Sequence, residues 1–185
     1  MIEEIKADAD ERMGKSLDAL RSTLGRIRTG RASPSLVDGI EIAYYGNDTP
    51  LNQVASIIVE DARTLVITPW EKKLIPDIQK AVLKSDIGIT PAATSDLIRL
   101  PLPALTEENR RDLARQAKHE AEGARVAVRN IRRDAIHDVR ELVKEKDVAE
   151  DAGHKAEEDI QKLTDKRVGE IDSALGAKET ELMEI

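Results

Sequence analysis

The chain has 185 residues and a formal charge of −7 at pH 7, a length that suits one sizeable domain or two small ones. It has no cysteine, which excludes disulfides and thiolate metal sites, and its 2% aromatic content is typical of long helices rich in Ala, Leu and Ile that pack as a bundle. No apolar run approaches the roughly 20 residues that cross a membrane, and the first residues lack a signal-peptide pattern, so we expect a cytoplasmic protein with no membrane partner.

The first predicted element is a helix over residues 2–28. Its apolar side chains recur every three or four residues, as the buried face of an α-helix requires. They are Ile2, Ile5, Ala9, Met13, Leu17, Leu20, Leu24 and Ile27. Thr29 and Gly30 end the pattern, with glycine at the usual stop position.

The segment 31–104 has a different composition and predicts a small, β-rich α+β domain. Strands are expected at 39–45, 54–59, 64–68 and 96–100, with a turn at 46–50 and a helix at 74–83. The short polar link between the second and third strands predicts that they are antiparallel neighbours. Trp70 follows the third strand, and we expect it to pack within this domain rather than to offer a platform for base stacking.

A second long helix is predicted after the connector Pro101-Leu102-Pro103, whose two prolines favour an extended and fairly stiff chain. Thr106 is the expected N-cap, and the helix runs from there to about Glu145. Its apolar seam again advances in steps of three and four. The seam consists of Leu113, Ala117, Ala121, Ala124, Val128, Ile131, Ala135, Val139 and Leu142.

A third helix, rich in acidic residues, is predicted from about Ala149 to near the C-terminus. Three amphipathic helices can share one core, so we predict an α+β fold of two domains. Residues 1–29 and 106–185 form a long antiparallel three-helix bundle, and residues 31–104 form a small α+β domain inserted between its first two helices. The two chain crossings, near 30–31 and 101–105, predict a hinge. Its residues are Gly30, Arg31, Pro101, Pro103, Ala104 and Leu105.

The most unusual feature of the second helix is the segment 123–133, which carries four arginines and no acid. On an α-helix, Arg125, Arg129 and Arg132 fall within an arc of about 60°, and Arg133 widens it to about 100°. An acidic protein that collects positive charge on one helix face has either an anionic partner for it or acids on another helix that neutralise it.

Both interpretations of this row remain open from the residues alone. Glu122 is at the three- or four-residue spacing of an intrahelical ion pair with Arg125, and the other arginines lack such a neighbour. Guanidinium groups bind phosphate oxygens bidentately, so a rigid helix that presents them suits structured RNA. Arg26, Arg28 and Arg31 could extend such a surface.

Other chemistry is not indicated by the sequence. His119, His137 and His154 lie singly, and no phosphate-binding glycine loop or nucleophile motif is present. Carboxylates are abundant but follow the spacing of solvated helix faces. We therefore expect a protein that is not an enzyme and needs no metal or cofactor.

Residues 125–135, which read RVAVRNIRRDA, resemble the signature of the bacterial ribosome recycling factor family. Further similar blocks follow in family order along the whole chain. They are residues 27–36, 44–46, 98–103, 105–108, 161–165 and 181–183. The sequence departs from the family pattern at Thr90, where Asn is expected, and at Ala104, where Pro is common. The second departure would loosen one strand of the hinge slightly.

The resemblance implies an L-shaped, monomeric protein of two domains that binds the ribosome after termination. Its partners would be large-subunit ribosomal RNA at the subunit interface and elongation factor G, which with GTP separates the subunits. Arg129 and Arg132 would be the leading RNA contacts, and Arg125, Arg133, Arg28 and Arg31 would come second. The alternative from another class is a helical adaptor or chaperone that pairs its charged helices with a protein partner.

Overall fold

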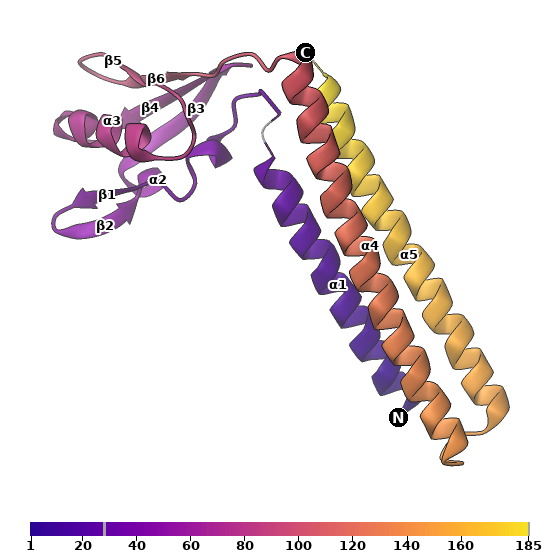
Figure 1. The fold of residues 1–185 in the computed structure, drawn as a ribbon. Helices are drawn as coiled ribbons and strands as arrows, with labels where there is room; N and C mark the ends of the chain where they lie inside the picture. The colour runs from indigo at the N-terminus through magenta and orange to yellow at the C-terminus, as the bar shows by residue number, and fades with distance from the viewer. Residues whose placement is uncertain (28, 185) are drawn as a thin grey trace. The chain divides into compact units, whose positions relative to one another are not determined.

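The computed structural model describes residues 1–27 and 29–184, and the chain divides into two compact units. Unit 1 comprises Met1–Ile27 and Glu107–Ile185, and unit 2 comprises Arg28–Thr106. Unit 1 is built from long helices, and all of the described strands belong to unit 2 (Figure 1). The predicted α+β fold, a helical bundle with an inserted small β-rich part, is confirmed.

Unit 1 is a bundle of the three helices α1 (Ile2–Arg26), α4 (Glu107–Lys144) and α5 (Glu150–Met183). Helix α4 runs antiparallel to the other two and packs against both of them (Figure 1). At 38 residues it is about 57 Å long. One continuous core therefore extends along most of this length.

The core of the bundle consists of the apolar seams that the sequence predicts. Helix α1 buries Met13 and Leu17 most completely among its large side chains, whereas α5 buries Ile160, Ile171 and Leu182. Helix α4 contributes mainly small residues to this core. They are Ala117, Ala121, Ala124, Val128, Ile131, Ala135 and Val139.

The turn from α4 to α5 brings the two helices into close contact at its base. Lys146 has φ +62°, and the backbone N–H groups of Asp147 and Val148 donate to the Leu142 carbonyl at 3.0 and 3.3 Å. In the first turns of α5, a Cβ atom on Gly153 would lie only 2.5 Å from Cγ2 of Val143. Only glycine therefore lets the α5 backbone lie this close to α4 at this point.

Unit 2 has a four-stranded antiparallel sheet in the order β3-β4-β6-β5, and a separate hairpin of β1 and β2. The sheet strands are β3 (Ala55–Asp61), β4 (Thr64–Pro69), β6 (Ile98–Pro101) and β5 (Ala92–Ala93). Helix α3 (Ile75–Lys84) buries Ile75, Ile78 and Val82 in the core of this unit, beside Leu65 and Ile67 of β4. The predicted antiparallel pairing of the second and third strands is confirmed as β3 and β4.

Two predictions for unit 2 were wrong. The expected turn over 46–50 is confined to Tyr45 and Gly46, whose positive φ angles of +48° and +81° suit a tight hairpin. The chain from Asn47–Pro50 is therefore strand β2, paired with β1 (Glu41–Tyr44), and the short helix α2 (Leu51–Val54) follows.

Trp70 is the second correction, because its side chain is 69% exposed rather than packed. The alternation along β4 buries Leu65, Ile67 and Pro69 on one face. Trp70 comes next in this alternation, so its side chain lies on the opposite face of the strand, away from the core. Its backbone N–H still donates to the Val54 carbonyl at 3.0 Å, so the backbone is fixed while the indole is exposed.

Replacing Gly153 with alanine should destabilise the bundle by about 1 kcal/mol. Overpacking against Val143 costs about 1–3 kcal/mol, and the better helix propensity of alanine offsets about 1 kcal/mol of it. Chemical denaturation followed by far-ultraviolet circular dichroism measures the difference.

Gly169→Ala is the matched control on the same helix, because the added Cβ there would have no atom within 4 Å apart from its chain neighbours and the backbone of its own helix. That variant should gain up to about 1 kcal/mol from helix propensity alone. Equal stabilisation by both substitutions would contradict the close contact at Gly153.

Candidate nucleic-acid interface

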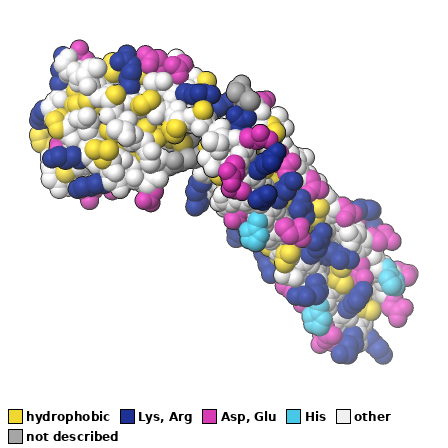
Figure 2. All heavy atoms as spheres, turned by 45° about the horizontal axis from the view of Figure 1, so that its top comes forward, with side chains coloured by type: hydrophobic (Ala, Val, Ile, Leu, Met, Phe, Trp, Pro, Cys, Tyr) yellow, Lys and Arg dark blue, Asp and Glu magenta, His cyan; other side chains and the backbone are white. Residues whose placement is uncertain are grey.

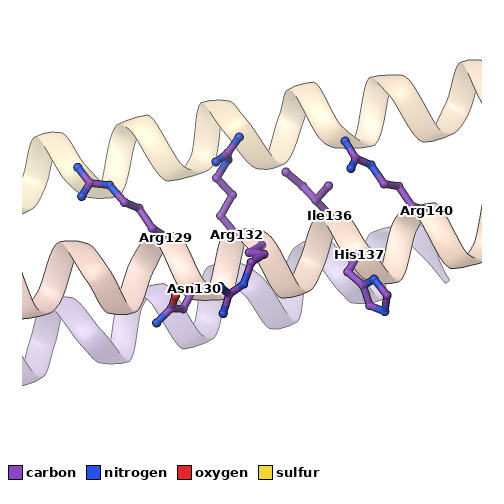
Figure 3. Close-up of a pocket in the computed structure, with 7 residues that line it drawn as sticks. Arg129, Asn130, Arg132, Ile136, His137 and Arg140 are labelled. Carbon is purple, nitrogen blue, oxygen red and sulfur yellow. The ribbon is translucent and has the colours of Figure 1, made fainter.

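The C-terminal half of α4 carries a groove of about 510 Å³ that is lined mainly by basic side chains. The lining residues are Arg129, Asn130, Arg132, Arg133, Ile136, His137 and Arg140. Figure 3 shows Arg129, Arg132, Ile136 and Arg140 pointing from α4 toward α5, whereas Asn130 and His137 lie on the other side of the helix. Three of the four arginines of the predicted row, Arg129, Arg132 and Arg133, therefore line the same groove.

Arg125 is absent from this groove, because acids of two helices hold it. Its Nε and Nη2 atoms donate to the carboxylate of Asp172 on α5 at 3.0 and 2.6 Å, and its Nη1 donates to Glu122 at 3.1 Å. The side chain is only 19% exposed. Hydrogen bonding to Asp172 raises the pKa of Arg125 above its ordinary value, which reflects the direct contact between the guanidinium and the carboxylate.

Arg129 keeps most of its binding capacity. Its side chain is 57% exposed, and its Nη1 lies 3.6 Å from the carboxylate of Glu122, which also accepts the hydrogen bond from Arg125. Glu122 therefore neutralises part of two arginines from the N-terminal side of the groove. An ion pair of this length between exposed groups is weak, so an incoming phosphate can replace it.

Arg132 and Arg133 make no ion pair with any of the described residues. The Nε atom of Arg132 is buried and has no hydrogen-bond partner within the described part of the chain. Arg133 is exposed, and its neighbour Asp134 pairs with Arg12 of α1 at 3.3 Å. The buried Nε of Arg132 cannot reach a partner, so the donors available to one are the other N–H groups of Arg132 and the guanidinium of the exposed Arg133.

Arg140 closes the other end of the groove and pairs with Glu157 of α5. Its Nε and Nη2 donate to the two carboxylate oxygens at 2.8 and 3.0 Å, a bidentate arrangement. This contact holds the pKa of Glu157 below its ordinary range, and the nearby charges of His154 and Arg132 act in the same direction. Acids of α5 thus neutralise Arg125 and Arg140, which lie before and after Arg129, Arg132 and Arg133 along α4.

Four of the lining residues were not predicted from the sequence. They are Asn130, Ile136, His137 and Arg140. Arg140 could have been found, because residues 129, 132, 136 and 140 follow helical spacing on one face. Their shared groove depends on where α5 lies, and a periodic pattern within α4 carries no information on that.

The other predicted contact residues are Arg31 and Arg28. Arg31 belongs to unit 2, and Arg28 lies outside the described residues. Arg26, at the end of α1, donates to the Ser22 hydroxyl at 3.2 Å.

The predicted hinge segments also have a defined local structure. Gly30 has φ +78°, and a Cβ there would contact the Leu105 side chain at 3.2 Å. Pro101 is the last residue of β6, opposite Thr64, and the Leu102 N–H donates to the Arg63 carbonyl at 2.7 Å. Irregular chain therefore begins only at residue 102 and extends to residue 106. Pro103, Ala104 and Leu105 lie within it.

Basic and acidic side chains are interspersed along the bundle in the view of Figure 2. Within residues 1–27 and 29–184, no three His, Asp or Glu side chains are grouped as a metal site would need. Nor does any helix of that part combine the length and the apolar character of a membrane span.

Comparisons with known proteins identify relatives over the whole chain. A sequence model of the family described as "Ribosome recycling factor" matches residues 20–183. The chain is 53% identical to the ribosome-recycling factor of Saccharophagus degradans and 56% identical to that of Alcanivorax borkumensis, with 100% of both sequences covered in each case.

Solved structures agree with this similarity. A solution structure of a ribosome recycling factor matches with a TM-score of 0.82 and 38% identity, covering 100% of this chain and 98% of the other. A second match, with a TM-score of 0.66 and 40% identity, covers 100% of both chains. It comes from models for the T. thermophilus ribosome recycling factor and E. coli elongation factor G bound to the E. coli post-termination complex.

The Arg140–Glu157 pair should make the stability of the bundle fall in acid. Because the folded pKa of Glu157 lies below its unfolded value of about 4.3, its contribution is complete above about pH 5 and is lost as the pH falls through the folded pKa. For a pair this exposed we expect on the order of 0.5–1 kcal/mol. Thermal unfolding of wild type and Glu157→Gln over this pH range measures the difference, which should vanish at the acidic end.

Glu158→Gln serves as the control, because Glu158 is exposed and makes no ion pair within the described part of the chain. Its unfolding free energy should follow that of the wild type at every pH. A pH-independent difference between wild type and Glu157→Gln would contradict the assignment.

Proposed function

This chain belongs to the ribosome recycling factor family, and from that premise we propose that it binds the ribosome after termination and, with elongation factor G and GTP, promotes separation of the subunits. The relative solved as a model with elongation factor G on the post-termination complex supports this partnership. A role on the ribosome also supports a cytoplasmic location. The protein would act as a monomer.

The observation that carries the proposal is the section of α4 at Arg129, Arg132 and Arg133, where the one ion pair to a described residue is the 3.6 Å contact of Arg129 with Glu122. These arginines lie on a helix buried along its other side, so their spacing is fixed. Guanidinium groups at fixed positions suit the phosphate oxygens of a folded RNA, which is recognised by shape and backbone. We therefore assign this section as the contact with large-subunit ribosomal RNA at the subunit interface.

The bundle has the mechanical character that such a role needs. Its core is continuous from Ala9 to Leu24 on α1 and includes Ile27 just after it, and charged side chains link the helices across the surface. Lys6 pairs with Asp159 at 3.0 Å, and Arg167 donates to Asp10. A bundle with a shared core and charged contacts between its helices can transmit a force along its length. The protein would then be a non-enzymatic factor, because the GTP chemistry belongs to elongation factor G.

The second candidate function is a helical adaptor that binds a protein partner. The exposed acids of α5 favour it, because they could pair with a basic surface. Salt distinguishes the two functions, since binding to RNA releases condensed counterions and weakens steeply as the salt concentration rises.

Arg132→Glu should weaken binding to isolated large ribosomal subunits by more than about tenfold, because a phosphate contact becomes a repulsion. Arg133→Glu should act in the same direction without a packing effect, since Arg133 is exposed. Binding is measured by sedimentation with the subunits, and circular dichroism checks that each variant keeps its helices.

Arg111→Glu is the matched control for these substitutions. It changes the charge of the same helix equally, but Arg111 is exposed near the other end of α4 and pairs with Glu107. It should bind nearly as the wild type does. If Arg132→Glu and Arg133→Glu also bound normally and split ribosomes at the normal rate, the RNA assignment would be wrong.

We also propose that residues 103–105, with Gly30 and Arg31, act as a hinge between the units. Gly30→Pro restricts the chain there, because proline fixes φ near −65° whereas Gly30 has φ +78°. The variant should bind ribosomes normally and split them severalfold more slowly, as light scattering follows. Ala104→Gly, which frees the chain instead, should not slow splitting. Unaltered splitting by Gly30→Pro would count against the hinge.

A further inference from the structure

We propose that two carboxylates of α5, Glu157 and Asp172, limit the RNA-binding section of α4 and thereby determine which polyanions the protein binds. The proposal rests on the function proposed above, because it concerns the selectivity of the same surface. It assigns these acids as specificity-determining residues that need not touch the RNA themselves.

Asp172 removes Arg125 from the binding row. All three nitrogens of the Arg125 guanidinium donate to carboxylates, two of them to Asp172 and one to Glu122. A guanidinium has five N–H donors, and this geometry uses both its forked edge and its remaining arm. While Asp172 is present, the charge of this largely buried side chain is neutralised and its donors are used, so it is not available to a phosphate.

Glu157 neutralises Arg140 in a similar way, on the C-terminal side of the binding section. It accepts two parallel hydrogen bonds from Arg140, and its own side chain is only 25% exposed, so α5 holds it firmly in place. Arg140 lines the groove and points toward α5 (Figure 3). With its bidentate edge used, Arg140 contributes shape to the groove but little net charge.

Between these two pairs, Arg129, Arg132 and Arg133 keep most of their positive charge, because the one ion pair among them to a described residue is the 3.6 Å contact of Arg129 with Glu122. They span five residues, or about 6 Å along α4, whereas the segment from Arg125 to Arg140 spans about 22 Å. The α5 carboxylates therefore reduce a long basic stripe to a short section. Such a section can satisfy two or three phosphates in one folded arrangement, but it gives an unstructured polyanion few contacts along its length.

This limit gives selectivity to a protein whose target is a single folded site. Each arginine that contacts a phosphate adds to the affinity for any nucleic acid, regardless of its sequence or shape. Freeing Arg125 and Arg140 would therefore strengthen binding to arbitrary RNA more than binding to the fitted site. The ratio of the two affinities, rather than either affinity alone, is the quantity that Glu157 and Asp172 control.

The test compares wild type, Glu157→Gln, Asp172→Asn and the double variant in binding to single-stranded poly(U) RNA and to isolated large ribosomal subunits. Affinities are measured over a series of salt concentrations. For poly(U), the slope of log affinity against log salt should steepen by about 0.7 for each arginine released. Affinity for poly(U) at low salt should rise at least threefold in the double variant, and affinity for the subunits should change less.

Asp159→Asn is the matched control, because Asp159 is another α5 carboxylate and pairs with Lys6 of α1, outside the row. It removes the same charge and should leave the poly(U) slope unchanged. Glu157→Asp keeps the charge and should behave as the wild type.

If Glu157→Gln and Asp172→Asn matched Asp159→Asn while the wild type still bound large subunits, this inference would be overturned and the proposed function would stand. Failure of the wild type to bind large subunits would overturn both.

Discussion

The close approach of α4 and α5 is the constraint on which the rest of unit 1 depends. Four of the seven buried residues of α4 are alanine, so its backbone can lie near both neighbouring helices. Gly153 permits the same closeness at the start of α5. Because the helices are near, carboxylates of α5 reach guanidinium groups of α4 directly. The electrostatics of the arginine row is therefore a consequence of how small the core side chains are.

Much of this fold could be predicted from the sequence, because hydrophobic periodicity is a local property. The seams of α1 and α4 follow from steps of three and four. Helix α4 begins where it was predicted to, directly after Thr106, and ends at Lys144, one residue before the predicted end. The predicted hairpin turn over 46–50 is longer than the observed one, which consists of Tyr45 and Gly46. A non-glycine residue with positive φ leaves almost no compositional signal, so the start of β2 could not be read.

The candidate site was only partly predictable for a different reason. Arg129, Arg132 and Arg133 belong to a run that is visible in the sequence, and they do meet in one groove. The neutralisation of Arg125 depends on Asp172, which lies 47 residues away on another helix. No pattern within one helix indicates which acid of a neighbour will face it. The exposure of Trp70 likewise follows from the alternation of side chains along β4, which continues through Pro69, one residue beyond the predicted end of that strand.

The distribution of aromatic residues gives the two units very different optical properties. The one tryptophan and both tyrosines lie in unit 2, and the chain has no phenylalanine, so unit 1 is without any aromatic chromophore. Intrinsic fluorescence therefore reports on unit 2 alone, and the exposed indole of Trp70 makes it sensitive to whatever covers that face. The bundle can be followed in the same sample by its helical circular dichroism. The natural sequence thus provides a separate optical signal for each unit without any added label.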